Sequence, residues 1–184
     1  NGGSGNMADD GGFCEYDGVY PPPACGFTRE GFDFLGWATS AKGKVVYQDG
    51  QSIQGLSSKN GTVIKLFAVW QAHSYRVAFD GNGASSGKMK EMTKRACGSA
   101  YALTANAFKR TSYSFAGWNT APDGSGSAFA NKAKQMNFAT ENGALLTLYA
   151  QWTPTEYKIT YKNIVAGDGN PNPETYTVES ETIV

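Results

Sequence analysis

Four side chains in this sequence could support metal binding, redox chemistry or nucleophilic catalysis, namely Cys14, Cys25, Cys97 and His73. The cysteines form no Cys-x-x-Cys pair, and His73 lies at no usual zinc-ligand spacing from them. No Gly-x-Ser-x-Gly motif or comparable arrangement supplies a nucleophile that His73 could activate. The sequence therefore predicts no catalytic residue, no metal site and no cofactor, and we expect His73 to be a solvated residue.

Cys14 and Cys25 are candidates for a disulfide, because they lie eleven positions apart (25 − 14 = 11) in one segment. An oxidising exterior would favour a bond that closes this loop, and the loop-entropy model gives it about 2–3 kcal/mol. Two independent buried thiols are the alternative, since connectivity cannot be read from a sequence. Cys97 has no partner cysteine in its own repeat and is expected to be a small core or turn residue.

Two polar segments faintly resemble calcium-binding loops, Asp80-Gly81-Asn82-Gly83 and Asp168-Gly169-Asn170. Both lack the ligand spacing and the closing Glu of an EF-hand. Asn60-Gly61-Thr62 matches the N-glycosylation pattern, but Asn-Gly is also a common pair in hairpin turns. We therefore expect tight turns at all three places.

Composition and charge indicate which kinds of binding partner this chain is not expected to have. Sixteen basic side chains balance sixteen acidic ones, whereas nucleic-acid binders and polybasic membrane anchors carry a basic excess. No apolar run is long enough to span a bilayer, and the opening Asn1-Gly2-Gly3 is not a signal peptide. We expect no nucleic-acid partner and no membrane insertion in this fragment, which we interpret as a piece cut from a longer protein.

The sequence contains an internal repeat in which three segments recur in order. The Gly-Trp pairs are offset by 117 − 36 = 81 positions, and the later segments are offset by 152 − 70 = 82. The matched pairs are Gly31–Thr39 with Ser112–Thr120, Leu66–Trp70 with Leu148–Trp152, and Tyr75–Phe79 with Tyr157–Tyr161. Self-similarity at a fixed offset is the signature of modules arranged in series.

This repeat predicts how the chain divides. The expected parts are a first repeat without its opening strand (1–70), a linker (71–74), a complete second repeat (75–152), a second linker (153–156) and the start of a third repeat (157–184). Because the two linkers have equal length, neighbouring repeats are expected to share one relative geometry.

Comparison of the copies predicts which positions are buried. Ile64, Leu66, Ala68 and Trp70 alternate with variable residues, which is typical of a half-buried strand. A glycine inside each Gly-Trp strand indicates a bulge or a close backbone approach. The structural anchors predicted in this way are Gly36, Trp37, Trp70, Gly117, Trp118 and Trp152. Good helix formers over Ala130–Asn137 favour a short helix.

These motifs resemble the Listeria–Bacteroides repeat family. The resemblance rests on Phe79-Asp80-Gly81-Asn82-Gly83, on Phe108–Trp118 with its counterpart Phe27–Trp37, and on Leu148-Tyr149-Ala150-Gln151-Trp152. It implies an α+β, mostly β, fold of tandem small β-grasp (ubiquitin-like) modules in an elongated array, and it implies no catalytic residues. Phe13–Cys25, with Pro21-Pro22-Pro23, and Ser112 in place of the usual Gly depart from the family pattern.

The resemblance and the repeat together predict a non-enzymatic function. We expect a structural segment (stalk, spacer or filament-forming) of a secreted or cell-surface bacterial protein, located outside the cell. The alternative is an adhesive module that recognises a host protein or a glycan, with Phe13–Cys25 as one candidate surface. Expected partners are the neighbouring repeats and also other copies of the chain. The latter would join head to tail, because Tyr157–Tyr161 is the type of strand that the first repeat lacks.

Overall fold

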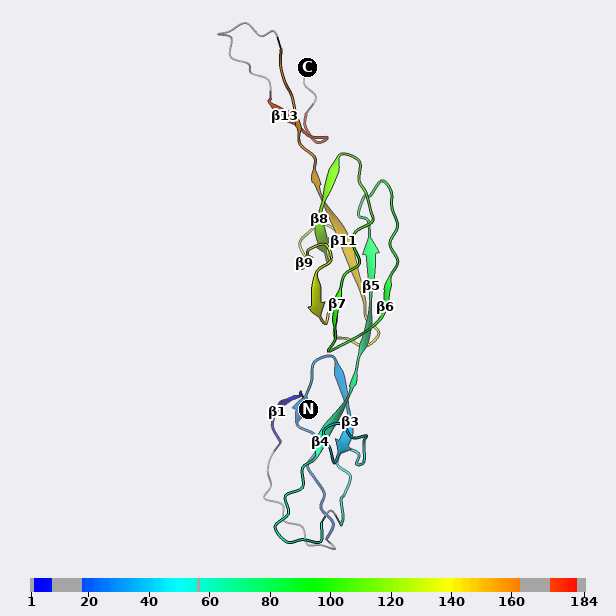
Figure 1. The fold of residues 1–184 in the computed structure, drawn as a ribbon, viewed down its shortest axis with the longest axis vertical. Coiled ribbons are helices and arrows are strands. Elements are labelled where there is room, and N and C mark those ends of the chain that lie inside the picture. The colour runs from blue at the N-terminus through cyan, green and yellow to red at the C-terminus, as the bar shows by residue number, and fades with distance from the viewer. Residues whose placement is uncertain (1, 8–17, 56, 163–172, 182–184) are drawn as a thin grey trace. The chain divides into compact units, whose positions relative to one another are not determined.

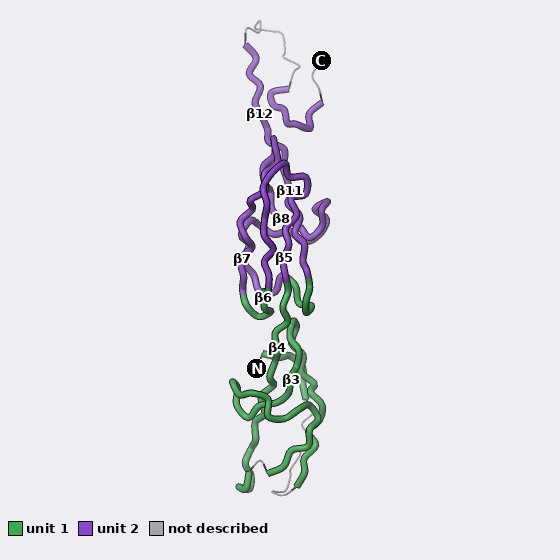
Figure 2. Tube along the Cα trace, turned by 90° about the vertical axis from the view of Figure 1, so that its right-hand side faces the viewer, with its two compact units in different colours: residues 1–75, 94–99, 139–144 green, residues 76–93, 100–138, 145–184 purple. Residues whose placement is uncertain are grey.

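A computed structural model of the chain describes residues 2–7, 18–55, 57–162 and 173–181 (Figure 1). The chain divides into two compact units (Figure 2). Unit 1 comprises residues 1–75, 94–99 and 139–144, and unit 2 comprises residues 76–93, 100–138 and 145–184. Unit 1 therefore combines the first sequence repeat with two short segments from the second.

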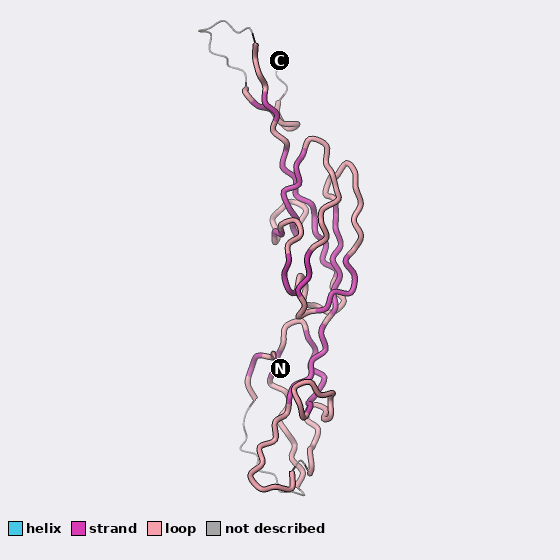
Figure 3. The backbone as a smooth tube through the Cα atoms, viewed as in Figure 1, coloured by secondary structure: helices cyan, strands magenta, loops and turns pink. Residues whose placement is uncertain are grey.

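The described residues form strands, turns and loops (Figure 3). They contain no helix, and so none that is long and apolar enough to cross a membrane. The mostly β expectation is confirmed, but the α+β class is not, since a β-grasp module packs a helix on its sheet and none occurs in the described ranges.

The largest sheet has the strand order β6-β5-β11-β8-β9. Its strands are β5 (Ser74–Asp80), β6 (Met92–Ala96), β8 (Tyr113–Asn119), β9 (Ala128–Phe129) and β11 (Leu145–Pro154). The first half of β11 pairs in parallel with β5, and its second half pairs antiparallel with β8. The first and last strands of the second repeat thus lie side by side, as Figure 1 shows.

The short helix expected over Ala130–Asn137 is wrong. Instead, β10 (Lys134–Met136) pairs antiparallel with β7 (Ala100–Ala102). Lys132 and Asn137 bracket β10 with φ values of 60° and 55°, which no right-handed helix accommodates. Helix propensity is a weak prior, and strand pairing overrides it in this short segment.

Unit 1 contains two small antiparallel pairs. β1 (Ser4–Gly5) pairs with β2 (Phe27–Thr28), and β3 (Phe32–Ala38) pairs with β4 (Phe67–Ala72). At the other end of the chain, in unit 2, β12 (Tyr157–Lys158) pairs with β13 (Thr175–Tyr176).

The Gly-Trp strands are built alike in the two units. The β3–β4 register shifts between Phe34 and Gly36, and the β8–β11 register shifts opposite Gly117. Gly36 and Gly117 have φ values of 140° and 149°, and a Cβ would lie 2.6 Å from the carbonyl oxygen of Tyr47 and 3.0 Å from that of Phe129. The predicted bulge and close backbone approach are therefore confirmed.

The tryptophans beside these bulges are core residues. Trp37 is 4% exposed and Trp118 is 1% exposed. The ring centroids of Phe34 and Trp37 lie 5.0 Å apart at 65°, and those of Phe115 and Trp118 have the same spacing and angle. Edge-to-face packing of this kind adds about 0.5–1.5 kcal/mol per pair beyond area burial.

Residues 63–67 and 145–149 have matching sequence positions but different structures. Leu145–Tyr149 is strand and pairs with β5, and Leu148 is 0% exposed. Residues 63–66 form no strand, and Val63 and Ile64 are 79% and 37% exposed. The prediction that Ile64 is buried is therefore wrong, because no partner strand lies beside it among the described residues.

Candidate functional site

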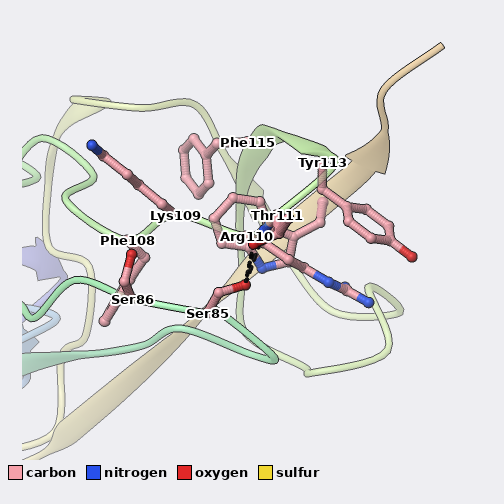
Figure 4. Close-up of a pocket in the computed structure, with 9 residues that line it drawn as sticks. Ser85, Ser86, Phe108, Lys109, Arg110, Thr111, Tyr113 and Phe115 are labelled. Carbon is pink, nitrogen blue, oxygen red and sulfur yellow. Dashed lines mark hydrogen bonds between the residues drawn. The ribbon is translucent and has the colours of Figure 1, made fainter. Parts of the chain in front are cut away.

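Unit 2 carries an open groove of about 510 Å³ on one face (Figure 4). Its lining combines aromatic rings, two basic side chains and four hydroxyl groups. The residues are Ser85, Ser86, Phe108, Lys109, Arg110, Thr111, Tyr113, Phe115 and Trp152.

Internal contacts hold most of these side chains. The guanidinium carbon of Arg110 lies 3.8 Å from the ring centroid of Tyr113, a cation–π arrangement. The backbone N–H of Thr111 donates to Ser85 Oγ at 2.9 Å, which Figure 4 draws as part of the groove wall. The rings of Phe115 and Trp152 pack edge to face at 5.7 Å. Chemically, the groove offers flat apolar faces beside a cation and suits a sugar ring or a planar group.

The same arrangement recurs in unit 1, where the guanidinium carbon of Arg29 lies 3.6 Å from the ring centroid of Phe32. An added Cβ on Gly2 would meet Arg29, as one on Gly83 would meet Arg110. Both repeats place an arginine on an aromatic ring at matching positions, so this contact is part of the repeat fold. The groove alone therefore does not indicate a ligand.

Unit 1 contains a smaller cavity of about 150 Å³ beside Trp37 and Trp70. It is lined by Gly3, Phe27, Trp37, Leu66, Phe67, Ala68 and Trp70. In unit 2 the corresponding space is filled from β5, since Phe79 packs on Trp118 with ring centroids 4.9 Å apart.

The matching tryptophans Trp70 on β4 and Trp152 on β11 differ in the hydrogen bonding of their indole N–H groups. Trp152 Nε1 donates to the carbonyl oxygen of Gly81 at 2.9 Å. Trp70 Nε1 is buried and has no hydrogen-bond partner among the described residues. A buried donor without a partner costs about 1–3 kcal/mol. We call the cavity, this donor and residues 63–66, which form no strand, the acceptor edge of unit 1.

His73 is not the solvated residue that we expected. Its side chain is 16% exposed and lies between β4 and β5 in unit 1. Nε2 lies 2.9 Å from Asp33 Oδ1, and Nδ1 lies 2.7 Å from the carbonyl oxygen of Thr140. The Asp33 carboxylate and the Thr140 carbonyl both raise the His73 pKa.

One backbone hydrogen bond at the linkers is the same in both units. The His73 N–H donates to the Gly31 carbonyl oxygen at 2.8 Å, and the Thr155 N–H donates to that of Ser112 at 2.8 Å. Gly31 has a φ of 77° and Ser112 a φ of 61°. Ser112 thus keeps the left-handed conformation that the family glycine would supply, at a strain on the order of 1 kcal/mol.

The turn predictions hold within the described ranges. The Asn82 N–H donates to Asp80 Oδ1 at 2.7 Å, and Asn82 Nδ2 donates to the carbonyl oxygens of Pro122 and Ala150. Asn82 is therefore a structural clamp. No cluster of three or more His, Cys, Asp or Glu side chains able to hold a metal occurs in the part of the chain that is described. The segment Asp168-Gly169-Asn170 lies outside that part.

The cysteines are placed as follows. Cys14 lies outside the described residues, so its bond to Cys25 remains a prediction. Cys25 is half-buried, with Sγ 3.7 Å from the carbonyl oxygen of Phe27. Cys97 is 3% exposed and donates from Sγ to the Ala139 carbonyl oxygen at 3.4 Å. Burial, and then the Glu30 carboxylate, raise the pKa of the Cys97 thiol.

Native alkylation checks these assignments. Without reductant, we expect iodoacetamide to leave Cys97 unlabelled, because the thiolate is the reactive form and burial disfavours it. If the predicted disulfide is present, Cys25 becomes labelled only after reduction, and the intact mass of the untreated chain is about 2 Da below the reduced mass. Labelling of both Cys14 and Cys25 in the untreated chain would exclude that disulfide.

Sequence reasoning missed the acceptor edge and the His73 contacts. The cavity carries no signal in the sequence, because its lining comes from segments as far apart as Gly3 and Trp70. The His73 contacts carry no such signal, because Asp33 and Thr140 are 40 and 67 positions away (73 − 33 and 140 − 73) and belong to different repeats.

Three features occur twice in this chain: the bulged Gly-Trp strand, the buried tryptophan beside it and the linker hydrogen bond. The chain is therefore a tandem array of small β repeats. It belongs to the Listeria-Bacteroides repeat domain family, whose profile matches residues 1–63 and 75–151. Two repeats of that family therefore account for most of the sequence.

Two relatives come from Evansella cellulosilytica. One, named "Putative membrane protein", is 30% identical over 149 residues, which cover 79% of this chain and 20% of the relative. The other, named "Putative Gly-rich membrane protein", is 31% identical over 147 residues, covering 74% of this chain and 16% of the relative. The chain thus spans a fifth or less of the length of either relative. No solved structure matches it.

Proposed function

We propose that the chain is a structural segment, a stalk or spacer, of a bacterial cell-surface protein. The observation that carries this proposal is the repeated linker: His73 and Thr155 make the same 2.8 Å backbone bond to the residue that precedes the Gly-Trp strand. A linker tied down by backbone bonding restricts the freedom between repeats, which a spacer requires. Two relatives with membrane proteins in their names support a location at the cell envelope.

Small-angle X-ray scattering tests the spacer proposal. We expect the scattering of the chain to fit an extended particle, whose radius of gyration exceeds the roughly 16 Å of a compact 184-residue protein. Replacing Gln71–Ser74 by a longer Gly/Ser linker should broaden the distance distribution, because such linkers behave as flexible coils. A compact particle, or no change with the flexible linker, would contradict a spacer function.

We also propose that the acceptor edge joins one copy of the chain to another, head to tail. The donor would be Tyr157–Tyr161, which matches Tyr75–Phe79 at an offset of 82. Tyr157 and Lys158 are exposed and pair only with the two-residue strand β13 among the described residues. The unit 1 cavity and the unpaired Trp70 Nε1 favour this assembly.

An adhesive function is the alternative candidate. The groove of unit 2 supports it, because Tyr113, Phe115 and Trp152 present rings next to Arg110. A glycan-array screen would test it, with Arg110→Ala compared against Arg29→Ala. Glycan binding that only Arg110→Ala removes would support the groove, and binding that neither variant changes would exclude it.

A further inference from the structure

We propose that His73 is a pH-sensitive fastener, which in its imidazolium form ties residues 139–144 to the start of β3. The proposal starts from hydrogen-bond chemistry. Both ring nitrogens face oxygens that can only accept, the Asp33 carboxylate at 2.9 Å and the Thr140 carbonyl at 2.7 Å. A neutral imidazole has one N–H and can serve one of these oxygens, whereas the imidazolium carries an N–H on each nitrogen and forms an ion pair with the Asp33 carboxylate while Nδ1 donates to the Thr140 carbonyl.

The surroundings of the ring favour the charged form. The charged groups that act on the ring are two carboxylates, Asp33 on β3 and Glu141 in the loop 139–144, and both raise its pKa. Partial burial opposes them but is outweighed, and the pKa lies above the ordinary 6.5. From the segment 94–99, the Cys97 N–H donates to the His73 carbonyl oxygen at 2.9 Å, and the Cys97 thiol is buried, which raises its pKa.

The contacts around His73 join three segments that are distant in sequence. Its ring binds β3 and Thr140, its N–H binds Gly31, and its carbonyl oxygen accepts from Cys97. Two more hydrogen bonds hold the loop 139–144. Ser74 N–H donates to Asn142 Oδ1 at 3.1 Å, and Gly143 N–H donates to the Ser74 carbonyl oxygen at 2.7 Å. Losing one ring bond would therefore loosen this end of unit 1 without unfolding it.

The direction of the pH effect follows from the sign of the shift. A folded-state pKa above the unfolded value stabilises the fold when the group is protonated. The contribution of His73 is therefore complete below pH 6.5 and is lost as the pH rises through the folded-state pKa. Because histidine titrates near neutral pH, small changes in pH alter the protonation of His73 and hence its contacts.

The second linker provides a matched reference. Thr155 stands at the position of His73 and makes the same 2.8 Å backbone bond, but it cannot titrate. The counterpart of Asp33 there is Ser114, and Tyr113 instead donates from its hydroxyl to Glu179 Oε1 at 2.7 Å. Amide exchange at Cys97 and at Thr155 can be compared in one sample, so the hydroxide dependence that the two amides share cancels in their ratio, and neither amide is a sequence neighbour of the titrating ring.

The test is NMR on the whole chain, in which the single histidine gives one unambiguous titration. We expect the His73 pKa to lie above 6.5, and the protection of the Cys97 amide, relative to that of Thr155, to fall several-fold as pH rises through it. Asp33→Asn should lower that pKa. His73→Gln, which carries no charge, should make the ratio independent of pH while the fold is retained. A His73 pKa at or below 6.5, or a ratio that stays constant while the ring titrates, would overturn the proposal.

Discussion

Trp118→Ala should unfold unit 2, or bring it close to unfolding, while unit 1 stays folded. Trp118 is 1% exposed, and the rings of Phe79, Phe108 and Phe115 surround it at centroid distances of 4.9 to 6.3 Å. Truncation of a buried Trp or Phe to Ala costs about 3–5 kcal/mol. A module of about 80 residues has on the order of 4–12 kcal/mol in total, so this one change removes much of its stability.

Urea unfolding followed by two-dimensional NMR reports each unit separately, through amide signals of β8 and of β3. Met136→Ala is the control, since Met136 is 59% exposed and its loss should change stability by less than about 0.5 kcal/mol. Trp118→Phe should cost less than Trp118→Ala, because it keeps a ring and removes an indole N–H that has no partner among the described residues. Equal unfolding midpoints for Trp118→Ala and Met136→Ala would show that Trp118 is not the anchor.

Internal repetition explains why this core could be predicted from one sequence. Trp37 and Trp118 match at an offset of 81 and are both buried, and Leu148, which matches Leu66 at an offset of 82, is buried as well. The glycine inside the Gly-Trp strand indicated the bulge for the same reason, since both copies adopt a φ that an L side chain rarely accepts.

Where the prediction failed, the deciding contact lies far away in the sequence. Lys134–Met136 has helical propensity but forms a strand because Ala100–Ala102 pairs with it. Ile64 has the alternation of a buried strand but is exposed, because its counterpart Leu146 owes its environment to β5. His73 is positioned by Asp33 and Thr140, and neither residue type is informative without the fold.

A peptide with the sequence of residues 74–81 should bind unit 1 and complete its sheet. In unit 2, residues 76–80 lie parallel to Leu145–Tyr149, Val77 is 0% exposed, and Phe79 packs on Trp118. On the acceptor edge it would pair with residues 63–67 and fill the cavity of about 150 Å³ beside Trp37. The carbonyl oxygen of its Gly81 would accept the hydrogen bond that Trp70 Nε1 lacks.

The expected result is a selective stabilisation of unit 1. At a peptide concentration one hundred times its dissociation constant, mass action adds about 2.7 kcal/mol to the free energy of unfolding. The Trp70 indole proton should shift and become protected from exchange, whereas that of Trp152, which is already bonded, should not. The amides of residues 64–66 should become protected as they enter a ladder.

Two controls show whether the edge selects this strand type. A peptide with Phe79→Ser should bind more weakly, because it leaves the cavity beside Trp37 unfilled. A peptide with the sequence of residues 156–162 should compete with the first one, since it carries the same alternating pattern. Deletion of residues 157–184 should then abolish head-to-tail association of the chain but leave peptide binding intact. If the peptide binds but the Trp70 indole signal does not change, the peptide contacts another part of unit 1. If the two peptides compete but intact chains do not associate, the acceptor edge binds only strands supplied within one protein.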